Sequence, residues 1–178
     1  SVCTPRVAIA EPHINAARTA DLAQRAVERH AAMVLFPELG LSGYSIDDLA
    51  LQDALLDGVE SAIAELLEAS RDLPAVLIAG APLRSEGKLF NCALVIHRGA
   101  LLGAVPKTYL PNYREFYEKR QHSSAAHAID DTIAIAGERV PFGSDLIFAA
   151  TGIADLSLHV EICERSEERR VGKGCRFR

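Results

Sequence analysis

A chain of 178 residues with 49% hydrophobic and 24% charged residues is long enough for one domain with a sizeable core, and this composition excludes a disordered protein. The formal net charge of -5, without a basic stripe of interleaved aromatic residues, gives no support for nucleic-acid or acidic-membrane binding. Because we find no signal peptide and no apolar run near the roughly 18 residues of a transmembrane helix, we expect a cytoplasmic protein.

The cysteines and histidines are too scattered to indicate a disulfide framework or a metal site. The four cysteines form no CxxC pair, and free cysteines fit a reducing cytosol. The six histidines include no HExxH motif and no close pair at ligand spacing, so we expect no bound metal.

Hydrophobic patterns along the chain predict both helices and strands, and we assign it to the α/β class. The expected helices span 15–33 and 46–70, the expected strands span 34–36, 75–81, 91–96 and 101–105, and segments 132–136 and 145–148 lead to a last strand. The strand at 34–36 is a continuous apolar run of the kind that is buried on both faces. The pair 91–96 and 101–105 predicts a hairpin in which Gly99 takes a positive φ.

The last predicted strand places a thiol at an unusual position. Residues 156–163 alternate between apolar and polar side chains, and Cys163 lies on the polar side where the pattern ends. Glu161 and Glu164 supply a carboxylate on either side of it. A nucleophile and a small structural residue at a strand end are both open interpretations of this cysteine.

Two further charged residues lie at comparable positions. Glu38 follows one predicted strand and Lys107 follows another, at the start of a polar and aromatic loop over 107–118. In an α/β sheet the strand ends on one edge gather in a single crevice. The carboxylate would take the thiol proton of Cys163, the thiolate would attack a carbonyl carbon, and the ammonium would stabilise the oxyanion. The product is a thioester, with ammonia or an amine as leaving group.

Other chemistries find no motif in the chain. No GxSxG elbow offers a serine nucleophile, and no GxGxxG or GxxxxGK[ST] loop offers a nucleotide site. Taken singly, however, Glu38 is also explained as a surface residue after Pro37, and Lys107 as a solvated loop end.

Three short motifs add a resemblance to this pattern. The runs FPEL (36–39) with SGY (42–44), PKTYLP (106–111) and VEICE (160–164) resemble, in order, the three motifs of the nitrilase (carbon–nitrogen hydrolase) superfamily. Within it, the longer runs 36–48, 80–83, 91–99, 107–121 and 158–164 are similar to the amino-terminal glutaminase domain of glutamine-dependent NAD+ synthetases.

The resemblance implies a fold and a set of roles. The fold would be an α-β-β-α sandwich, here incomplete. Glu38 would be the general base, Lys107 the oxyanion stabiliser and Cys163 the nucleophile. Tyr113 would match a tyrosine that contacts the substrate L-glutamine, and Glu118 a second glutamate that positions the lysine and the substrate.

The resemblance also implies what lies beyond this chain. We expect residues 1–164 to be a partial glutaminase domain, cut at both ends, and residues 165–178 to be a basic tail unrelated to the family. The missing synthetase domain would use ATP and deamido-NAD+, neither of which we expect to bind here. The intact protein would be a homo-oligomer.

Two other functions remain open from the sequence. The chain resembles a superfamily whose other members act on a different amide, a carbamoyl amine or a nitrile. It is also compatible with a truncated and catalytically dead module.

Overall fold

The fold is described by a computed structural model, which covers residues 1–162. The predicted nucleophile Cys163 and the predicted tail 165–178 lie outside the described residues. Within the described part, no helix is long and apolar enough to cross a membrane.

Two helices, eight strands and three 3₁₀ turns make up the described chain. In order they are α1 (Pro12–Val27), β1 (Met33–Leu35), the turn η1 (Asp47–Leu51), α2 (Asp53–Ala69), β2 (Val76–Ser85), β3 (Lys88–His97), β4 (Ala100–Pro106), the turns η2 (Glu118–Arg120) and η3 (Ala125–His127), β5 (Thr132–Ile135), β6 (Glu138–Pro141), β7 (Ile147–Ala149) and β8 (Ser157–His159). This mixture confirms the α/β class.

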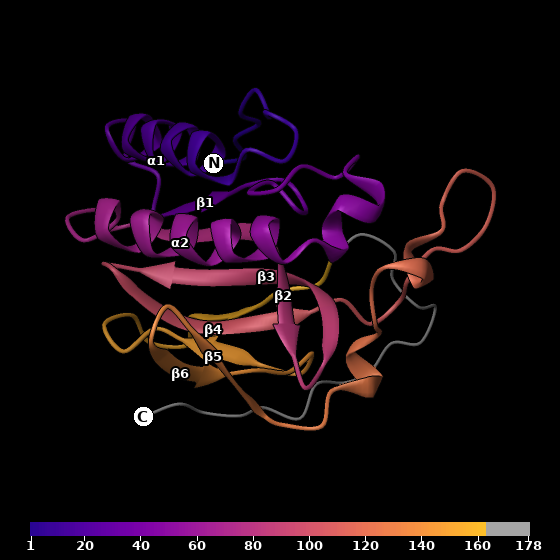
Figure 1. The fold of residues 1–178 in the computed structure, drawn as a ribbon. Coiled ribbons are helices and arrows are strands. Elements are labelled where there is room, and N and C mark those ends of the chain that lie inside the picture. Colours follow the sequence, from indigo (N-terminus) through magenta and orange to yellow (C-terminus); the bar gives the residue numbers. More distant parts are fainter. Residues whose placement is uncertain (163–178) are drawn as a thin grey trace.

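A four-stranded sheet in the order β1-β2-β3-β4 is the centre of the fold (Figure 1). β1 runs parallel to β2, and the other neighbours are antiparallel. β2 and β3 pair along their whole length, from Val76 opposite His97 to Ser85 opposite Lys88. The long hairpin therefore forms the middle of the sheet, with β1 on one side and β4 on the other.

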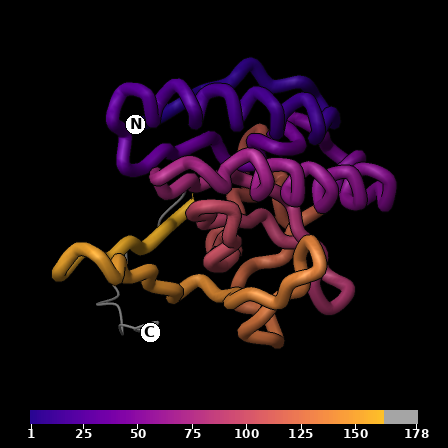
Figure 2. The backbone as a smooth tube through the Cα atoms, turned by 90° about the vertical axis from the view of Figure 1, so that its left-hand side faces the viewer, coloured from indigo at the N-terminus to yellow at the C-terminus, as the bar shows by residue number. Residues whose placement is uncertain are grey.

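Alternating side chains give the sheet two buried faces. Leu77, Ala79 and Ala81 of β2 belong to the core shared with α1 and α2, which form one layer above the strands (Figure 2). Ile78 points to the opposite face, where it belongs to a second apolar cluster with Phe148 of β7. Both faces of the sheet are thus covered, as strands rich in apolar residues require.

The structure corrects two predicted helices. The first begins at Pro12, a residue favoured in the first turn, and ends at Val27 rather than 33. The predicted helix over 46–70 is a 3₁₀ turn followed by α2, because Asp47 has φ 45° and Gln52 is extended, and neither conformation fits an α-helix.

The predicted strands are right in place and wrong in some details. β1 is not buried on both faces, since Leu35 is 40% exposed at the sheet edge. β6, which pairs with β5, was not predicted. The hairpin of β3 and β4 is confirmed, with positive φ at Arg98 and Gly99.

Candidate active site

Lys107 is the centre of the candidate site. Lys107 directly follows β4, and its side chain is completely buried. Its backbone N–H donates to the carbonyl of Asn91 at 2.8 Å. Its Nζ donates to Glu38 Oε1 at 2.6 Å and to Glu118 Oε1 at 2.8 Å. Burial alone would lower the pKa of Lys107, but the hydrogen bonds and charges of the two carboxylates outweigh it and raise that pKa. The ammonium is therefore charged at neutral pH.

Glu38 reaches Lys107 from the end of β1. The next residue, Leu39, has φ 51°, so the chain reverses directly after the carboxylate. The reversal packs against β2 at Gly80, where an added Cβ would lie 2.3 Å from the Leu39 nitrogen. Gly80 is thus required by a close approach of two backbones.

Asn91 provides a second donor to the same oxygen of Glu38. Its Nδ2 donates to Glu38 Oε1 at 2.6 Å from the middle of β3, where Asn91 is completely buried. One oxygen of Glu38 therefore accepts two hydrogen bonds, while the side chain keeps 19% of its surface exposed. This arrangement leaves the carboxylate held in place but reachable.

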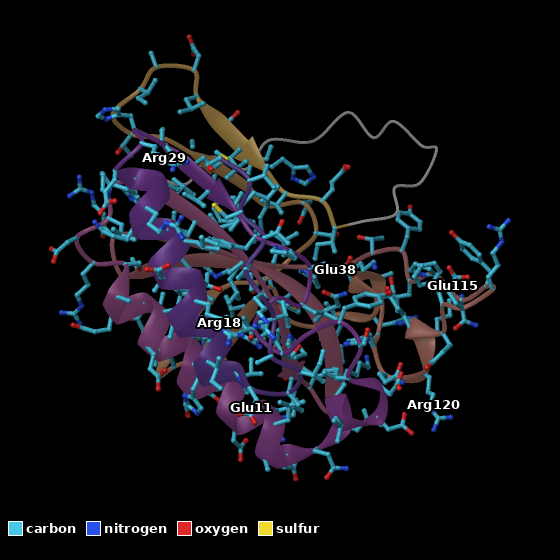
Figure 3. The ribbon with its side chains drawn as sticks, turned by 90° about the horizontal axis from the view of Figure 1, so that it is seen from above. Glu11, Arg18, Arg29, Glu38, Glu115 and Arg120 are labelled. Atoms are coloured by element: carbon cyan, nitrogen blue, oxygen red, sulfur yellow. The ribbon has the colours of Figure 1, made fainter. Side chains whose placement is uncertain are left out.

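Glu118 comes from the loop after β4 and completes the group. It is 7% exposed, and its Oε1 accepts from Lys107 and from the Tyr44 hydroxyl, the latter at 2.6 Å. In the described part of the chain, its Oε2 has no hydrogen-bond partner. Figure 3 shows Glu38 towards the middle of the molecule, with Glu115 and Arg120 of the Glu118 loop at the rim.

The structure brings three of the five predicted site residues together, and it describes one of the other two, Tyr113. Glu38, Lys107 and Glu118 form one hydrogen-bonded group. Tyr113 lies on the same loop, half exposed, with its ring 6.2 Å from that of Phe116 between centroids. Cys163 lies outside the described residues, and the described strand β8 ends four positions earlier, at His159.

A cleft of about 380 Å³ lies beside Glu118, lined by side chains from 39–50 and 115–122. His122 lines it while only 8% exposed, and burial lowers the pKa of its imidazole, which is therefore neutral at neutral pH. Within residues 1–162, neither of its ring nitrogens has a partner. The same part of the chain contains no group of three His, Cys, Asp or Glu side chains that fits a metal ion.

Comparison with known proteins decides the family. The family model described as carbon-nitrogen hydrolase matches residues 4–167. The chain belongs to the carbon-nitrogen hydrolase family. Its curated relatives include the glutamine-dependent NAD(+) synthetase of Mycobacterium tuberculosis (strain ATCC 25618 / H37Rv), 52% identical over 164 residues, and that of Mycobacterium leprae (strain TN), 49% identical over 167 residues. Each match covers 92% of this chain and 24% of the relative, so the chain spans about a quarter of their length.

Solved structures give the carbon-nitrogen hydrolase fold independent support. A glutamine-dependent NAD(+) synthetase from Cytophaga hutchinsonii matches with a TM-score of 0.74 at 22% identity, over 84% of this chain and 25% of that one. The corresponding protein from Acinetobacter baumannii matches with a TM-score of 0.64 at 28% identity, over 78% and 26%. An amidase from Nesterenkonia sp. matches with a TM-score of 0.60 at 21% identity, over 78% and 51%. The nitrilase-type fold expected from the motifs is thus shown.

Two residues of the candidate site were not predicted. Asn91 and Tyr44 lie within the runs that carried the resemblance, but neither was given a role. Asn91 carried a usable signal, because asparagine is depleted in strands and this one interrupts an apolar run. Tyr44 carried none, since its contact with Glu118 spans 74 positions in the chain.

Proposed function

We propose that this chain is the glutamine-hydrolysing part of a glutamine-dependent NAD+ synthetase, releasing ammonia for the amidation of deamido-NAD+. The observation that carries the proposal is the 52% identity over 164 residues to a relative of that name. The buried ammonium of Lys107 between two carboxylates supports it, because this group suits the chemistry of amide cleavage.

In the proposed mechanism, Glu38 is the general base and Cys163 the nucleophile. Glu38 takes the thiol proton, and the thiolate attacks the amide carbon of glutamine. The carbonyl π electrons move to oxygen, and the Lys107 ammonium stabilises that oxyanion. When the intermediate collapses, the C–N bond breaks and the nitrogen takes the proton from Glu38, leaving as ammonia.

The second half of the cycle restores the thiol. Water attacks the thioester carbon while Glu38 accepts its proton, and the C–S bond breaks to release glutamate. The proton then returns from Glu38 to Cys163. In this scheme Glu118 holds the Lys107 ammonium in place, and Tyr113 contacts the substrate from the same loop.

The remaining partners belong to the same proposal. ATP and deamido-NAD+ are assigned to a synthetase domain outside this chain, so this part needs no cofactor of its own. The length of the curated relatives, about four times this chain, supports such a domain. A homo-oligomeric intact protein is part of the proposal as well.

Ammonia release from glutamine tests the proposed activity. We expect the 178-residue chain to release ammonia and glutamate in equal amounts, and to turn over glutamine better than simple amides such as butyramide. Equal or better turnover of the simple amides would assign the chain to another carbon–nitrogen hydrolase instead.

Covalent labelling tests the nucleophile without requiring turnover. A diazoketone analogue of glutamine should label Cys163, as read by peptide mass spectrometry, and labelling should stop in Cys163→Ala. Cys3 and Cys92 are internal controls, because Cys92 is completely buried and burial raises the pKa of its thiol. Equal labelling of Cys3 and Cys163 would contradict the assignment.

A further inference from the structure

Two sets of polar contacts join the turn η1 to the loop that carries Glu118. The Tyr117 hydroxyl donates to Asp47 Oδ1 at 2.7 Å. The Arg120 guanidinium binds the Asp48 carboxylate through both oxygens, at 2.8 and 2.5 Å. Tyr117 and Arg120 flank Glu118 in the chain, so the loop is held on both sides of that carboxylate.

The loop has further attachments near Glu118: Gln121 Nε2 donates to Asp48 Oδ1 at 3.3 Å, the Tyr44 hydroxyl donates to Glu118 Oε1, and the Glu118 N–H donates to the Pro111 carbonyl at 3.1 Å. Its tyrosines are about half exposed: Tyr109 at 42%, Tyr113 at 51% and Tyr117 at 48%. The cleft is lined by side chains from both segments, among them Asp47 and Ala50 of η1 and Tyr117 of the loop. Figure 1 shows the loop after β4 projecting from the sheet beside the η1 turn.

We propose that Asp47 and Asp48 are positioning residues that act through Tyr117 and Arg120 to hold Glu118 against Lys107. This inference rests on the proposed function only for its effect on turnover. The bidentate geometry at Asp48 fixes the direction of approach as well as the distance. The bond from Tyr117 reaches Asp47 at a positive φ of 45°, a backbone conformation that needs support from its surroundings.

An exposed ion pair contributes little to stability by itself, and the Arg120–Asp48 pair is more than half exposed. Its importance lies in position, since a misplacement of about 1 Å at a catalytic group lowers turnover by about 10²-fold. We therefore expect loss of the contacts to change the Lys107 environment and turnover much more than stability.

Lysine ammonium NMR tests the positioning directly. The chain has four lysines, Lys88, Lys107, Lys119 and Lys173, so ¹⁵N labelling of lysine gives few signals, and Lys107→Arg assigns the buried one. We expect the Lys107 ammonium to be protected from hydrogen exchange in the unsubstituted chain. In Asp48→Asn and in Tyr117→Phe, exchange should become at least about fivefold faster.

Asp53→Asn is the matched control. Asp53 begins α2 and pairs with Arg84, which also pairs with Asp57. The Arg84 side chain is 43% exposed against 62% for Arg120, and none of these residues belongs to the Glu118 loop. The Asp53→Asn substitution should leave both the Lys107 signal and the turnover of glutamine unchanged. The charge swap Asp48→Arg with Arg120→Asp should restore protection at least in part, which a nonspecific loss of folding would not allow.

Turnover provides the second measurement. Asp48→Asn should lower kcat for glutamine about tenfold while KM changes less than threefold. An unchanged Lys107 signal in Asp48→Asn, or an equal effect of Asp53→Asn, would overturn the positioning role. Absence of glutamine hydrolysis in the unsubstituted chain would count against the proposed function alone, because the NMR comparison does not depend on it.

Discussion

Gly80→Ala is the sharpest test of how the fold positions Glu38. The added Cβ would lie 2.3 Å from the Leu39 nitrogen, 2.7 Å from the Pro37 oxygen and 2.9 Å from the Glu38 carbonyl carbon. Ordinary contact begins at 3.4 Å, so this segment must move by about 1.1 Å. All three atoms belong to the backbone, so no side chain can absorb the shift. The Leu41 N–H also donates a hydrogen bond to the Gly80 carbonyl at 3.0 Å, which holds the two segments together.

A shift of this size reaches the site. The bond between Lys107 Nζ and Glu38 Oε1 would lengthen from 2.6 Å to about 3.7 Å, beyond hydrogen-bond range. We expect the free energy of unfolding to fall by about 3 kcal/mol, the upper end for overpacking. Glutamine turnover should fall by about 10²-fold. Urea unfolding followed by circular dichroism, with ammonia release measured on the folded fraction, provides both values.

Gly58→Ala is the matched control for this prediction. Gly58 lies within α2, and its added Cβ would meet only Pro12, at 3.6 Å. The same chemical change should therefore raise the free energy of unfolding by up to about 1 kcal/mol through helix propensity. A neutral surface substitution changes the free energy of unfolding by about 0.5 kcal/mol or less. If the free energy of unfolding of Gly80→Ala lies that close to the value of the unsubstituted chain, the close-approach argument is wrong.

Three further substitutions test the charged and polar groups. Lys107→Met leaves the Glu38 and Glu118 carboxylates without their shared cation, so urea unfolding at pH 7 should show a loss of about 3–5 kcal/mol. Folding raises the pKa of Lys107, so the stabilisation from its charge is complete below pH 10.5 and is lost as pH rises further. Lys107→Met should therefore lack this alkaline decrease in the free energy of unfolding. Burial lowers the pKa of His122, so on acidification its imidazole is protonated in the unfolded chain before it is protonated in the folded chain. The free energy of unfolding therefore falls as pH drops below 6.5, and His122→Leu should remove this pH dependence from urea unfolding. Asn91→Leu removes a charged hydrogen bond from Glu38, and urea unfolding should show a loss of about 1.5–3 kcal/mol.

Local patterns predicted the parts of this structure that local forces determine. The β3–β4 hairpin followed from apolar runs and Gly99, and the positions of Glu38 and Lys107 at strand ends followed from the same patterns. The break before α2 could not be predicted in this way. It depends on the conformation of Asp47, whose partner Tyr117 lies 70 positions away.

The candidate site likewise contains residues that local patterns predicted and residues that depend on distant contacts. Strand ends and motif order brought Glu38, Lys107 and Cys163 into one hypothesis, and the family resemblance added Glu118. Asn91 and Tyr44 enter the site through tertiary contacts with partners 53 and 74 positions away. No local periodicity reports such distances, and only the polar interruption of β3 pointed to Asn91.

The group around Lys107 also has a consequence for the movement of charge. With both carboxylates ionised, one ammonium shared by Glu38 and Glu118 leaves a net negative group around the completely buried Lys107 side chain. A proton accepted by Glu38 would make that group neutral, so any anion formed nearby would meet no repulsion from it. The Lys107–Glu118 bond would survive the change, and the ammonium would be free to turn its remaining hydrogens towards a new partner. In the proposed mechanism the proton goes to Glu38, the more open of the two glutamates, whose side chain is 19% exposed against 8% for Glu118.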